Sequence, residues 1–167
     1  MKNLILIRHA KSNQNISSVS DKERPLNARG KKAAPFMAEY IKKKGVRFDL
    51  LISSPAERAY STAKKFADIF EYNRKEIKIV EELYGAAIHE ILDVIHAIDD
   101  KHNCVALVGH NPDLTQFNNY MVDTFIDNIP TCGIASLEFD INSWKDIEQG
   151  VGKLLFFEYP KKLNPLL

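Results

Sequence analysis

The stretch LILIRHAKSNQN, residues 4–15, runs four aliphatic side chains directly into an arginine and a histidine. A continuous apolar run of this length favours a strand that is buried on both faces, as in a parallel sheet. The residues from Arg8 and His9 onward are charged, polar or small. The end of this strand is therefore either an ordinary cap that has reached water or a strand tip that presents reactive side chains.

The rest of the chain alternates short apolar runs with segments of helical period. Strands are predicted over residues 3–8, 49–53, 77–80, 104–109, 134–140 and 153–159, and helices over 31–44, 55–70, 87–99 and from about 112 onward. Within the first helix, Pro35 indicates a kink or a late helix start. The alternation predicts an α/β fold: a three-layer sandwich with a mostly parallel central sheet of about six strands and helices on both faces.

Composition limits the classes of protein to which the chain can belong. Its 167 residues include 23 basic and 22 acidic side chains, so no excess of charge favours nucleic acid or a membrane surface as a partner. The apolar run at residues 4–7 is too short for a signal peptide or a membrane span. Cys104 and Cys132 lie in apolar settings without metal-ligand spacing, which favours free thiols in a reducing compartment. We therefore expect one cytoplasmic domain, residues 1–167, without metal or other cofactor.

Two later strands end in a similar pattern. In SSPAER (53–58), Ser54 is the predicted helix cap, and in GHNPD (109–113) the predicted cap is Asn111. A proline follows each cap at the first helical position, and a glutamate completes a capping box in the first case. Each strand would then turn directly into a helix N-terminus, where unpaired N–H groups and the positive end of the helix dipole favour an anion.

If these strands are neighbours, Arg8, His9, Arg58 and His110 converge on one pocket at the carboxyl ends of the strands. Two guanidinium groups match the oxygens of a phosphate. A neutral imidazole beside that phosphate can attack phosphorus, and nearby arginines keep the ring unprotonated. A second histidine can donate to the equatorial oxygens in the transition state. The four residues together predict a phosphoryl-transfer site.

Each motif is weak alone, because an Arg-His pair at a strand end is most often a surface cap. Their occurrence at three strand ends favours the catalytic interpretation. Ser12 and Asn15, just beyond the histidine, can add neutral hydrogen-bond donors for a phosphate. The chain contains neither a GxxxxGK[ST] loop nor an HExxH pair, so the sequence supports neither a nucleotide P-loop nor a zinc site.

Several segments, taken in order, carry a resemblance to a known family: LILIRHAKS (4–12), RPLNARG (24–30), SSPAERAYSTA (53–63), VGHNPDL (108–114) and GKLLFFEYPKKL (152–163). They resemble the histidine phosphatase superfamily, and most closely its small SixA-type phosphohistidine phosphatases. The resemblance spans essentially the whole chain and implies a phosphoglycerate mutase-like fold. It also implies a metal-independent transfer of phosphoryl to His9 and then to water, in a pocket formed with Arg8, Arg58 and His110.

The resemblance leaves one role open. The frequent Arg-His-Gly of the superfamily is Arg-His-Ala here, and Lys11 stands where larger members often have an acidic residue, as in the SixA-type branch. Asn15 falls where many members have an asparagine that contacts phosphate. For the general acid, the only region in register is EELYG (81–85), where Glu82 is the first candidate and Glu81 the second.

The sequence therefore predicts a phosphatase that hydrolyses phosphohistidine on a protein through a phosphohistidine intermediate on His9. No long insertion is available to cover the pocket, and an open site suits a phosphorylated side chain on a protein surface. Two alternatives remain. One is a phosphomonoesterase of the same superfamily that acts on a small phosphorylated molecule, and the other is a phosphate-recognition module without turnover. Neither nucleic acid nor a membrane is an expected partner.

Overall fold

The computed structural model describes residues 1–14 and 17–167 and contains a six-stranded sheet. The strands are β1 (Lys2–Arg8), β2 (Leu50–Ser53), β3 (Lys78–Ile79), β4 (Cys104–Gly109), β5 (Ile134–Phe139) and β6 (Gly152–Glu158). Their order in the sheet is β3-β2-β4-β1-β5-β6. The first four run parallel, and β5 is antiparallel to both β1 and β6. The predicted α/β fold with a mostly parallel six-stranded sheet is confirmed.

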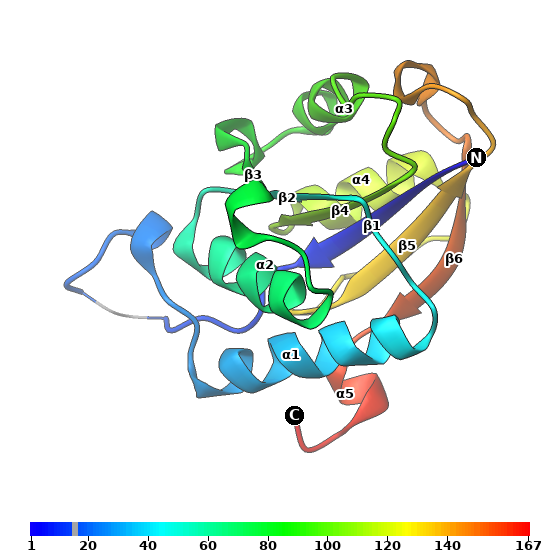
Figure 1. The fold of residues 1–167 in the computed structure, drawn as a ribbon. Helices are drawn as coiled ribbons and strands as arrows, with labels where there is room; N and C mark the ends of the chain where they lie inside the picture. The colour runs from blue at the N-terminus through cyan, green and yellow to red at the C-terminus, as the bar shows by residue number, and fades with distance from the viewer. Residues whose placement is uncertain (15–16) are drawn as a thin grey trace.

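Helices cover both faces of the sheet (Figure 1). They are α1 (Ala28–Lys43), α2 (Glu57–Ile69), α3 (Ile88–His96), α4 (Asp113–Met121) and the short α5 (Pro160–Leu163), with 3-10 turns η1 (Asp21–Glu23), η2 (Arg74–Glu76), η3 (Glu81–Leu83) and η4 (Trp144–Asp146). Strand β1 shows both layers. Leu4 and Leu6 pack with α3 and α4, whereas Ile5 and Ile7 pack with α1 and α2. Because successive side chains of a strand point to opposite faces, all four are buried, which explains the continuous apolar run.

Helix α1 begins earlier than the sequence pattern predicts. The side chain of Asn27 accepts a hydrogen bond from the Gly30 amide at 2.9 Å, and this cap starts the helix at Ala28. Pro35 consequently lies inside the helix, so the expectation of a late start was wrong. The apolar face of the helix buries Met37 among the residues it packs against, and this packing outweighs the loss of one main-chain donor at the proline.

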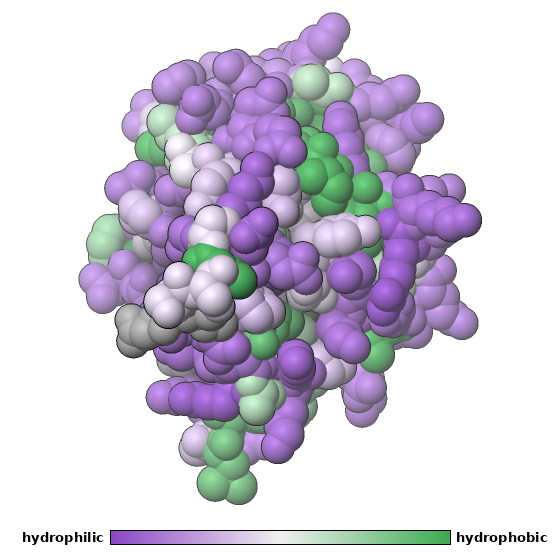
Figure 2. Space-filling view, turned by 90° about the vertical axis from the view of Figure 1, so that its left-hand side faces the viewer, coloured by the Kyte–Doolittle hydropathy of each residue, from purple (hydrophilic) through white to green (hydrophobic). Residues whose placement is uncertain are grey.

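The register of the sheet aligns the carboxyl ends of three neighbouring strands. Arg8 of β1 pairs with Gly109 of β4, and Ser53 of β2 pairs with Val108 of β4. These ends lie at the left in Figure 1, so Figure 2 looks directly onto them and shows a mainly hydrophilic face. Over the described residues, no helix has both the length and the apolar character needed to cross a bilayer.

Candidate active site

Main-chain hydrogen bonds hold the residues that follow β1, β2 and β4 at one level. The His9 amide donates to the carbonyl of Gly109, and the Ser54 amide donates to the carbonyl of Val108, both at 3.0 Å. Arg58 follows within the first turn of α2. The tertiary structure thus brings side chains from three separate segments to one edge of the sheet.

At this edge lies a cavity of about 180 Å³, which we call the phosphate pocket. Its lining residues are Arg8, His9, Lys11, Ser12, Gln14, Arg24, Arg58, His110, Asn111 and Thr131. The ring centroids of His9 and His110 lie 5.2 Å apart across it. The two predicted arginines, both predicted histidines and Ser12 therefore meet in one place. Asn15, the remaining predicted phosphate contact, lies outside the described residues.

His9 is held in a form suited to nucleophilic attack. Its Nδ1 lies 2.8 Å from the carbonyl oxygen of Ala10, which can only accept, so Nδ1 carries the hydrogen and Nε2 has a free lone pair. Burial lowers the pKa of His9 to about 3, and the charges of Arg58 and Arg8 act in the same direction. The ring is therefore neutral at physiological pH, as a nitrogen nucleophile must be.

His110 is also buried and neutral. Burial, followed by the charge of Arg58, lowers its pKa to about 4. Its Nε2 lies 2.7 Å from Ser54 Oγ, whereas its Nδ1 has no hydrogen-bond partner among the described residues. When the Ser54 hydroxyl donates to Nε2, the hydrogen of the ring lies on Nδ1, and this N–H has no acceptor among the described residues.

Ser54 is not the helix cap that the sequence pattern predicts. Helix α2 begins at Glu57 after Ala56, whose amide donates to Ser54 Oγ at 3.3 Å. The serine hydroxyl also bonds His110, so it orients a pocket histidine. The predicted capping box is wrong because Pro55 and Ala56 form the turn between the strand and the helix and do not belong to the helix.

The predicted cap at Asn111 is displaced in a similar way. Helix α4 begins at Asp113, one residue later than expected. Asn111 Oδ1 accepts from the Thr115 hydroxyl at 2.9 Å, and its Nδ2 donates to the carbonyl of Ile129 at 2.8 Å. The asparagine therefore ties the end of β4 to the segment that precedes β5.

Hydrogen bonds within the protein hold the guanidinium groups of both arginines. Arg8 Nη1 donates to the carbonyl of Ile129 at 2.9 Å, and Arg58 Nη1 donates to the carbonyl of Asp21 at 2.7 Å. The Nε atoms of both arginines are buried and have no partner among the described residues. Burial and the neighbouring Arg58 lower the pKa of Arg8. Two adjacent cations in a desolvated site favour a bound anion, which offsets their repulsion and offers acceptors.

A carboxylate that contacts this arrangement is Asp21, which sequence analysis missed. Its side chain accepts from Arg58 Nη2 at 3.2 Å and from the Tyr84 hydroxyl, and it forms an ion pair with Arg24 at 2.9 Å. The hydrogen bond from Tyr84, with the charge of Arg58 and smaller contributions, lowers the pKa of Asp21 to about 2. Asp21 is thus ionised at physiological pH. The sequence feature that could have identified Asp21 is its position three residues before the RPLNARG segment.

Comparison with known proteins identifies the family. A family model for the histidine phosphatase superfamily (branch 1) matches residues 4–91. The chain belongs to the histidine phosphatase superfamily. An uncharacterized protein of Mycobacterium tuberculosis is 27% identical to this histidine phosphatase over 166 residues, which cover 93% of this chain and 100% of the relative.

Solved structures share the fold of this histidine phosphatase. A candidate phosphohistidine phosphatase SixA from Agrobacterium tumefaciens superposes with a TM-score of 0.80 at 27% identity, covering 95% of this chain and 98% of that one. A protein histidine phosphatase SixA complexed with tungstate superposes with a TM-score of 0.83 at 19% identity, covering 97% of this chain and 99% of that one. A mycobacterial glucosyl-3-phosphoglycerate phosphatase complexed with VO3 superposes with a TM-score of 0.72 at 14% identity, covering 96% of this chain and 100% of that one. The phosphoglycerate mutase-like fold is confirmed, and these findings support phosphatase activity.

The structure does not bring the candidate general acids of this phosphatase into the phosphate pocket. Glu82 lines a separate hollow with His89 and Glu90, and Glu81 forms an ion pair with Lys22 at 3.0 Å. The reason is local: turn η3 buries Leu83 in the core and leaves both glutamates exposed. Among the described residues that line the pocket, none is a carboxylate.

The RPLNARG segment of this phosphatase supports the loop after β1. Arg24 Nη1 donates to Ser12 Oγ at 2.8 Å, and the Asn27 amide donates to the carbonyl of Lys11 at 3.0 Å. Gly30 packs against the same carbonyl so closely that a Cβ at this position would lie 2.1 Å from the Lys11 oxygen. The motif therefore holds the main chain that forms one wall of the pocket.

The side chains that the structure describes do not form a metal site. Over residues 1–14 and 17–167, no group of three or more histidine, cysteine, aspartate or glutamate side chains is arranged to hold a metal ion. The positive charge in the phosphate pocket comes from arginine and lysine side chains.

Proposed function

We propose that this protein removes the phosphoryl group from a phosphohistidine side chain of another protein, through a transient phosphohistidine on His9. One observation carries the proposal. A neutral His9, with Nδ1 held by the Ala10 carbonyl, stands beside two guanidinium groups in a pocket whose described lining has no carboxylate. This arrangement supplies a nucleophile and charge stabilisation without an evident proton donor.

In the first step, the Nε2 lone pair of His9 forms a bond to phosphorus while the phosphorus–nitrogen bond of the substrate breaks. Arg8 and Arg58 compensate the charge on the phosphoryl oxygens, and His110 Nδ1 donates to one of them. In the second step, water attacks phosphorus and the bond to Nε2 breaks. The electron pair returns to His9, and the proton of the water passes to the phosphate that leaves.

The leaving group decides between substrate classes. A phosphohistidine ring that is protonated on its other nitrogen leaves as neutral imidazole and takes no proton from the enzyme. An alkoxide, in contrast, needs a proton donor to leave at a useful rate. Asp21 is a poor donor because its pKa of about 2 leaves it ionised. The pocket chemistry therefore favours phosphohistidine over simple phosphate esters.

A small-molecule phosphomonoesterase is the second candidate function. The likeness in fold to a glucosyl-3-phosphoglycerate phosphatase favours it. For such a substrate, two titratable groups beside Arg58 are Asp21 and Tyr84, which share a hydrogen bond. One of them would have to protonate the ester oxygen as it leaves.

Turnover measurements separate these functions. We expect kcat/KM for a phosphohistidine-bearing protein to exceed that for p-nitrophenyl phosphate and sugar phosphates. Brief reaction with a ³²P-labelled phosphohistidine protein should label the enzyme, and the label should be absent in His9→Ala. A preference for esters would support the second candidate. Absence of both label and turnover would indicate a phosphate-recognition module.

We also propose a cytoplasmic location. Both cysteines are free in the structure, and Cys132 is fully buried in the core. Free thiols of this kind are typical of proteins in reducing compartments. The proposed partner is a phosphorylated protein, which meets the enzyme at the edge of the sheet where the strands end.

A further inference from the structure

A second cavity of about 290 Å³ adjoins the phosphate pocket, and we call it the basic cavity. The two share three lining residues, Arg8, Lys11 and Thr131. Beyond them the basic cavity extends between the start of α1, at Arg29, and the start of α5, at Lys161. Figure 1 shows α1 and α5 side by side. A molecule bound by its phosphoryl group can therefore reach the basic cavity without leaving the protein surface.

The charged side chains that line the basic cavity are all basic. Arg8, Lys11, Arg29 and Lys161 line it, and the described lining contains no aspartate or glutamate. None of the four forms an ion pair with an aspartate or glutamate side chain of the described residues. The chain as a whole is nearly neutral, with a formal charge of +1. Positive charge is thus concentrated at this place, where it attracts anions.

Contacts within the protein satisfy only part of these cations. Arg8 Nη1 donates to the Ile129 carbonyl at 2.9 Å, and Arg29 Nη2 donates to the main-chain oxygen of Leu167 at 2.6 Å. Each guanidinium group has five N–H donors, so both retain donors for a ligand. The ammonium groups of Lys11 and Lys161 have no hydrogen bond to described protein atoms. Charge-assisted hydrogen bonds from such groups are the strong ones.

We infer that the basic cavity binds a second anionic group of the substrate, and that this group is the carboxylate of an acidic side chain near the phosphohistidine. The inference rests on the proposed function and specifies its substrate. The cavity lies at the small end of the range for small-molecule sites, about 300–1,000 Å³. Ala33, Pro130 and Pro160 provide apolar contacts for the methylene groups of a side chain. Two-point binding would then orient the phosphoryl group toward His9.

Binding of phosphonates tests the cavity independently of turnover. Isothermal titration calorimetry would compare methylphosphonate with phosphonoacetate, 3-phosphonopropionate and 4-phosphonobutyrate, which add a carboxylate at increasing distance. We expect one carboxylated member to bind the wild-type protein about tenfold more tightly than methylphosphonate, a gain typical of a good charge-assisted contact. In Arg29→Gln and Lys161→Gln this gain should fall to about threefold or less.

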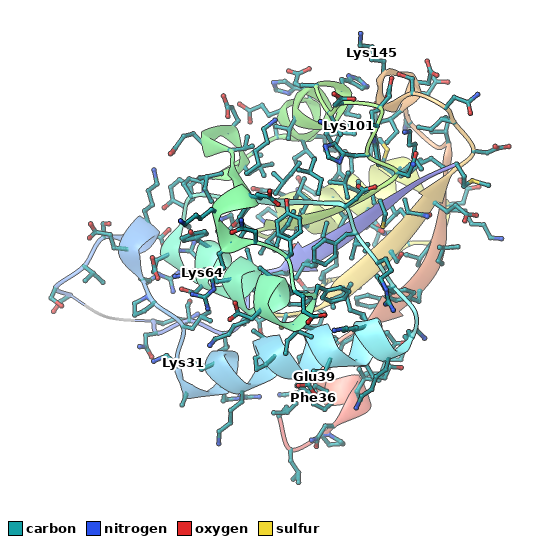
Figure 3. The ribbon with its side chains drawn as sticks, in the orientation of Figure 1. Lys31, Phe36, Glu39, Lys64, Lys101 and Lys145 are labelled. Carbon is teal, nitrogen blue, oxygen red and sulfur yellow. The ribbon has the colours of Figure 1, made fainter. Side chains whose placement is uncertain are left out.

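The matched control is Lys31→Gln, which removes the same charge from the same helix as Arg29→Gln. Lys31 lines a separate hollow with Lys64, on the side of α1 that faces α2 (Figure 3). The carboxylate gain should therefore be unchanged in this variant. An equal loss in Lys31→Gln and Arg29→Gln would indicate a general effect of net charge and overturn the inference.

Peptides identify the source of the carboxylate. Phosphohistidine peptides that carry either Glu or Gln on each side of the modified residue would be compared by kcat/KM. We expect the wild-type protein to prefer the Glu peptides about tenfold and Arg29→Gln to lose most of this preference. The contrary result is that the wild-type protein turns over the Glu and Gln peptides equally while binding a carboxylated phosphonate more tightly than methylphosphonate. That result would assign the cavity to a small dianionic substrate and overturn the inference that it binds an acidic side chain of a protein.

The two proposals fail in different ways. If the proposed function is wrong, no phosphohistidine peptide is turned over, whereas the phosphonate series still reports on the cavity. If the inference is wrong, peptides are turned over without regard to the flanking charge and the phosphonates bind equally. A carboxylate gain that persists in full in both Arg29→Gln and Lys161→Gln would also overturn it.

Discussion

His9 and His110 face each other with ring centroids 5.2 Å apart, although α1, α2 and α3 lie between them in the chain. The contact exists because β1 and β4 are neighbouring parallel strands whose ends are in register. Arg8 and Arg58 approach the same two rings from β1 and α2. Two guanidinium groups beside neutral imidazoles are suited to hold a phosphoryl group, as proposed above.

Replacing His9 with alanine should abolish phosphatase activity and leave the fold intact. The ring lies at the strand tip, so its removal takes little from the core, whereas loss of a nucleophile typically lowers kcat by about 10⁴-fold or more. Single-turnover kinetics with a phosphohistidine protein measures the first effect and thermal unfolding the second. An unfolded variant would mean that His9 is a structural residue.

Arg8→Ala and Arg58→Ala should each remove about 2–4 kcal/mol of transition-state stabilisation, by analogy with other hydrogen-bond donors that stabilise the charge developing in a transition state. The measurement is kcat/KM on the phosphohistidine protein. Arg58→Lys should recover only part of the activity, because an ammonium group cannot reproduce the bidentate geometry of a guanidinium. Full activity in Arg58→Lys would show that only the charge matters.

Lowering the pH from 6.5 toward 4 should destabilise the free enzyme. His9 and His110 stay neutral in the native state down to pKa values of about 3 and about 4, whereas in the unfolded chain they take up protons near 6.5. The unfolded state then binds more protons, so the free energy of unfolding falls by up to about 1.4 kcal/mol per pH unit for each histidine. Above 6.5 these two groups add no pH dependence.

Urea unfolding at several pH values measures this slope, and His110→Gln should reduce it. Imidazole nitrogen NMR of the native protein follows each ring directly. A pocket histidine that titrates near 6.5 in the free enzyme would contradict the prediction.

Replacing Asp21 with asparagine should lower kcat/KM on the phosphohistidine protein only about twofold to fivefold, because half-exposed ion pairs are screened by solvent. Asp21 positions Arg58, and its side chain is 54% exposed. Glu23→Gln, in the same turn η1, is the control and should change nothing. A role for Asp21 as a proton donor would instead appear as a steep loss of kcat on phosphate esters alone.

Replacing Glu82 with glutamine should leave kcat/KM within about twofold of the wild-type value, as expected for a surface substitution away from the site. Glu82 lines a different hollow from the phosphate pocket. The same phosphohistidine and ester assays apply. A loss of about 100-fold on esters would restore Glu82 as the general acid.

Replacing Gly30 with alanine should destabilise the protein by about 1–3 kcal/mol, the usual cost of overpacking. The new methyl group would collide with the carbonyl of Lys11, so the loop beside the pocket must shift and activity should fall as well. Chemical denaturation and kcat/KM provide the two readouts. Lys31→Ala, one residue along on the exposed face of α1, is the control for a change in the helix itself.

Much of the fold follows from local pattern. Strand β4 occupies the predicted residues, β1, β2 and β5 differ from prediction by one residue at one end, and β3 and β6 differ by one residue at each end. Continuous apolar runs identified the doubly buried strands β1, β4 and β5. The helix starts were less predictable. Ser54 and Asn111 have the residue types of N-caps, yet the Ser54 hydroxyl hydrogen-bonds His110 and the Asn111 amide donates to the carbonyl of Ile129. Such a competing tertiary contact leaves no periodicity in the sequence.

The sequence left the identity of the general acid open. Register along the chain favoured Glu82, but the structure turns that residue outward and joins Asp21 to Arg58. The difference arises because a 3-10 turn rotates successive side chains by about a third of a circle each, so burial of Leu83 exposes its neighbours. Asp21 reaches Arg58 from the short turn η1, which is distant from α2 in the sequence and carries no periodic pattern.

The amino-acid sequence alone shows which residue types stand at each strand end, because a buried strand must stop where its side chains become polar. It thereby identified Arg8, His9, Arg58 and His110 as residues that could share a phosphate. The adjacency and register of β2, β4 and β1, and the basic cavity beside the pocket, are visible only in the folded chain. Strand order and cavity shape depend on contacts between distant segments, and local sequence patterns do not encode such contacts.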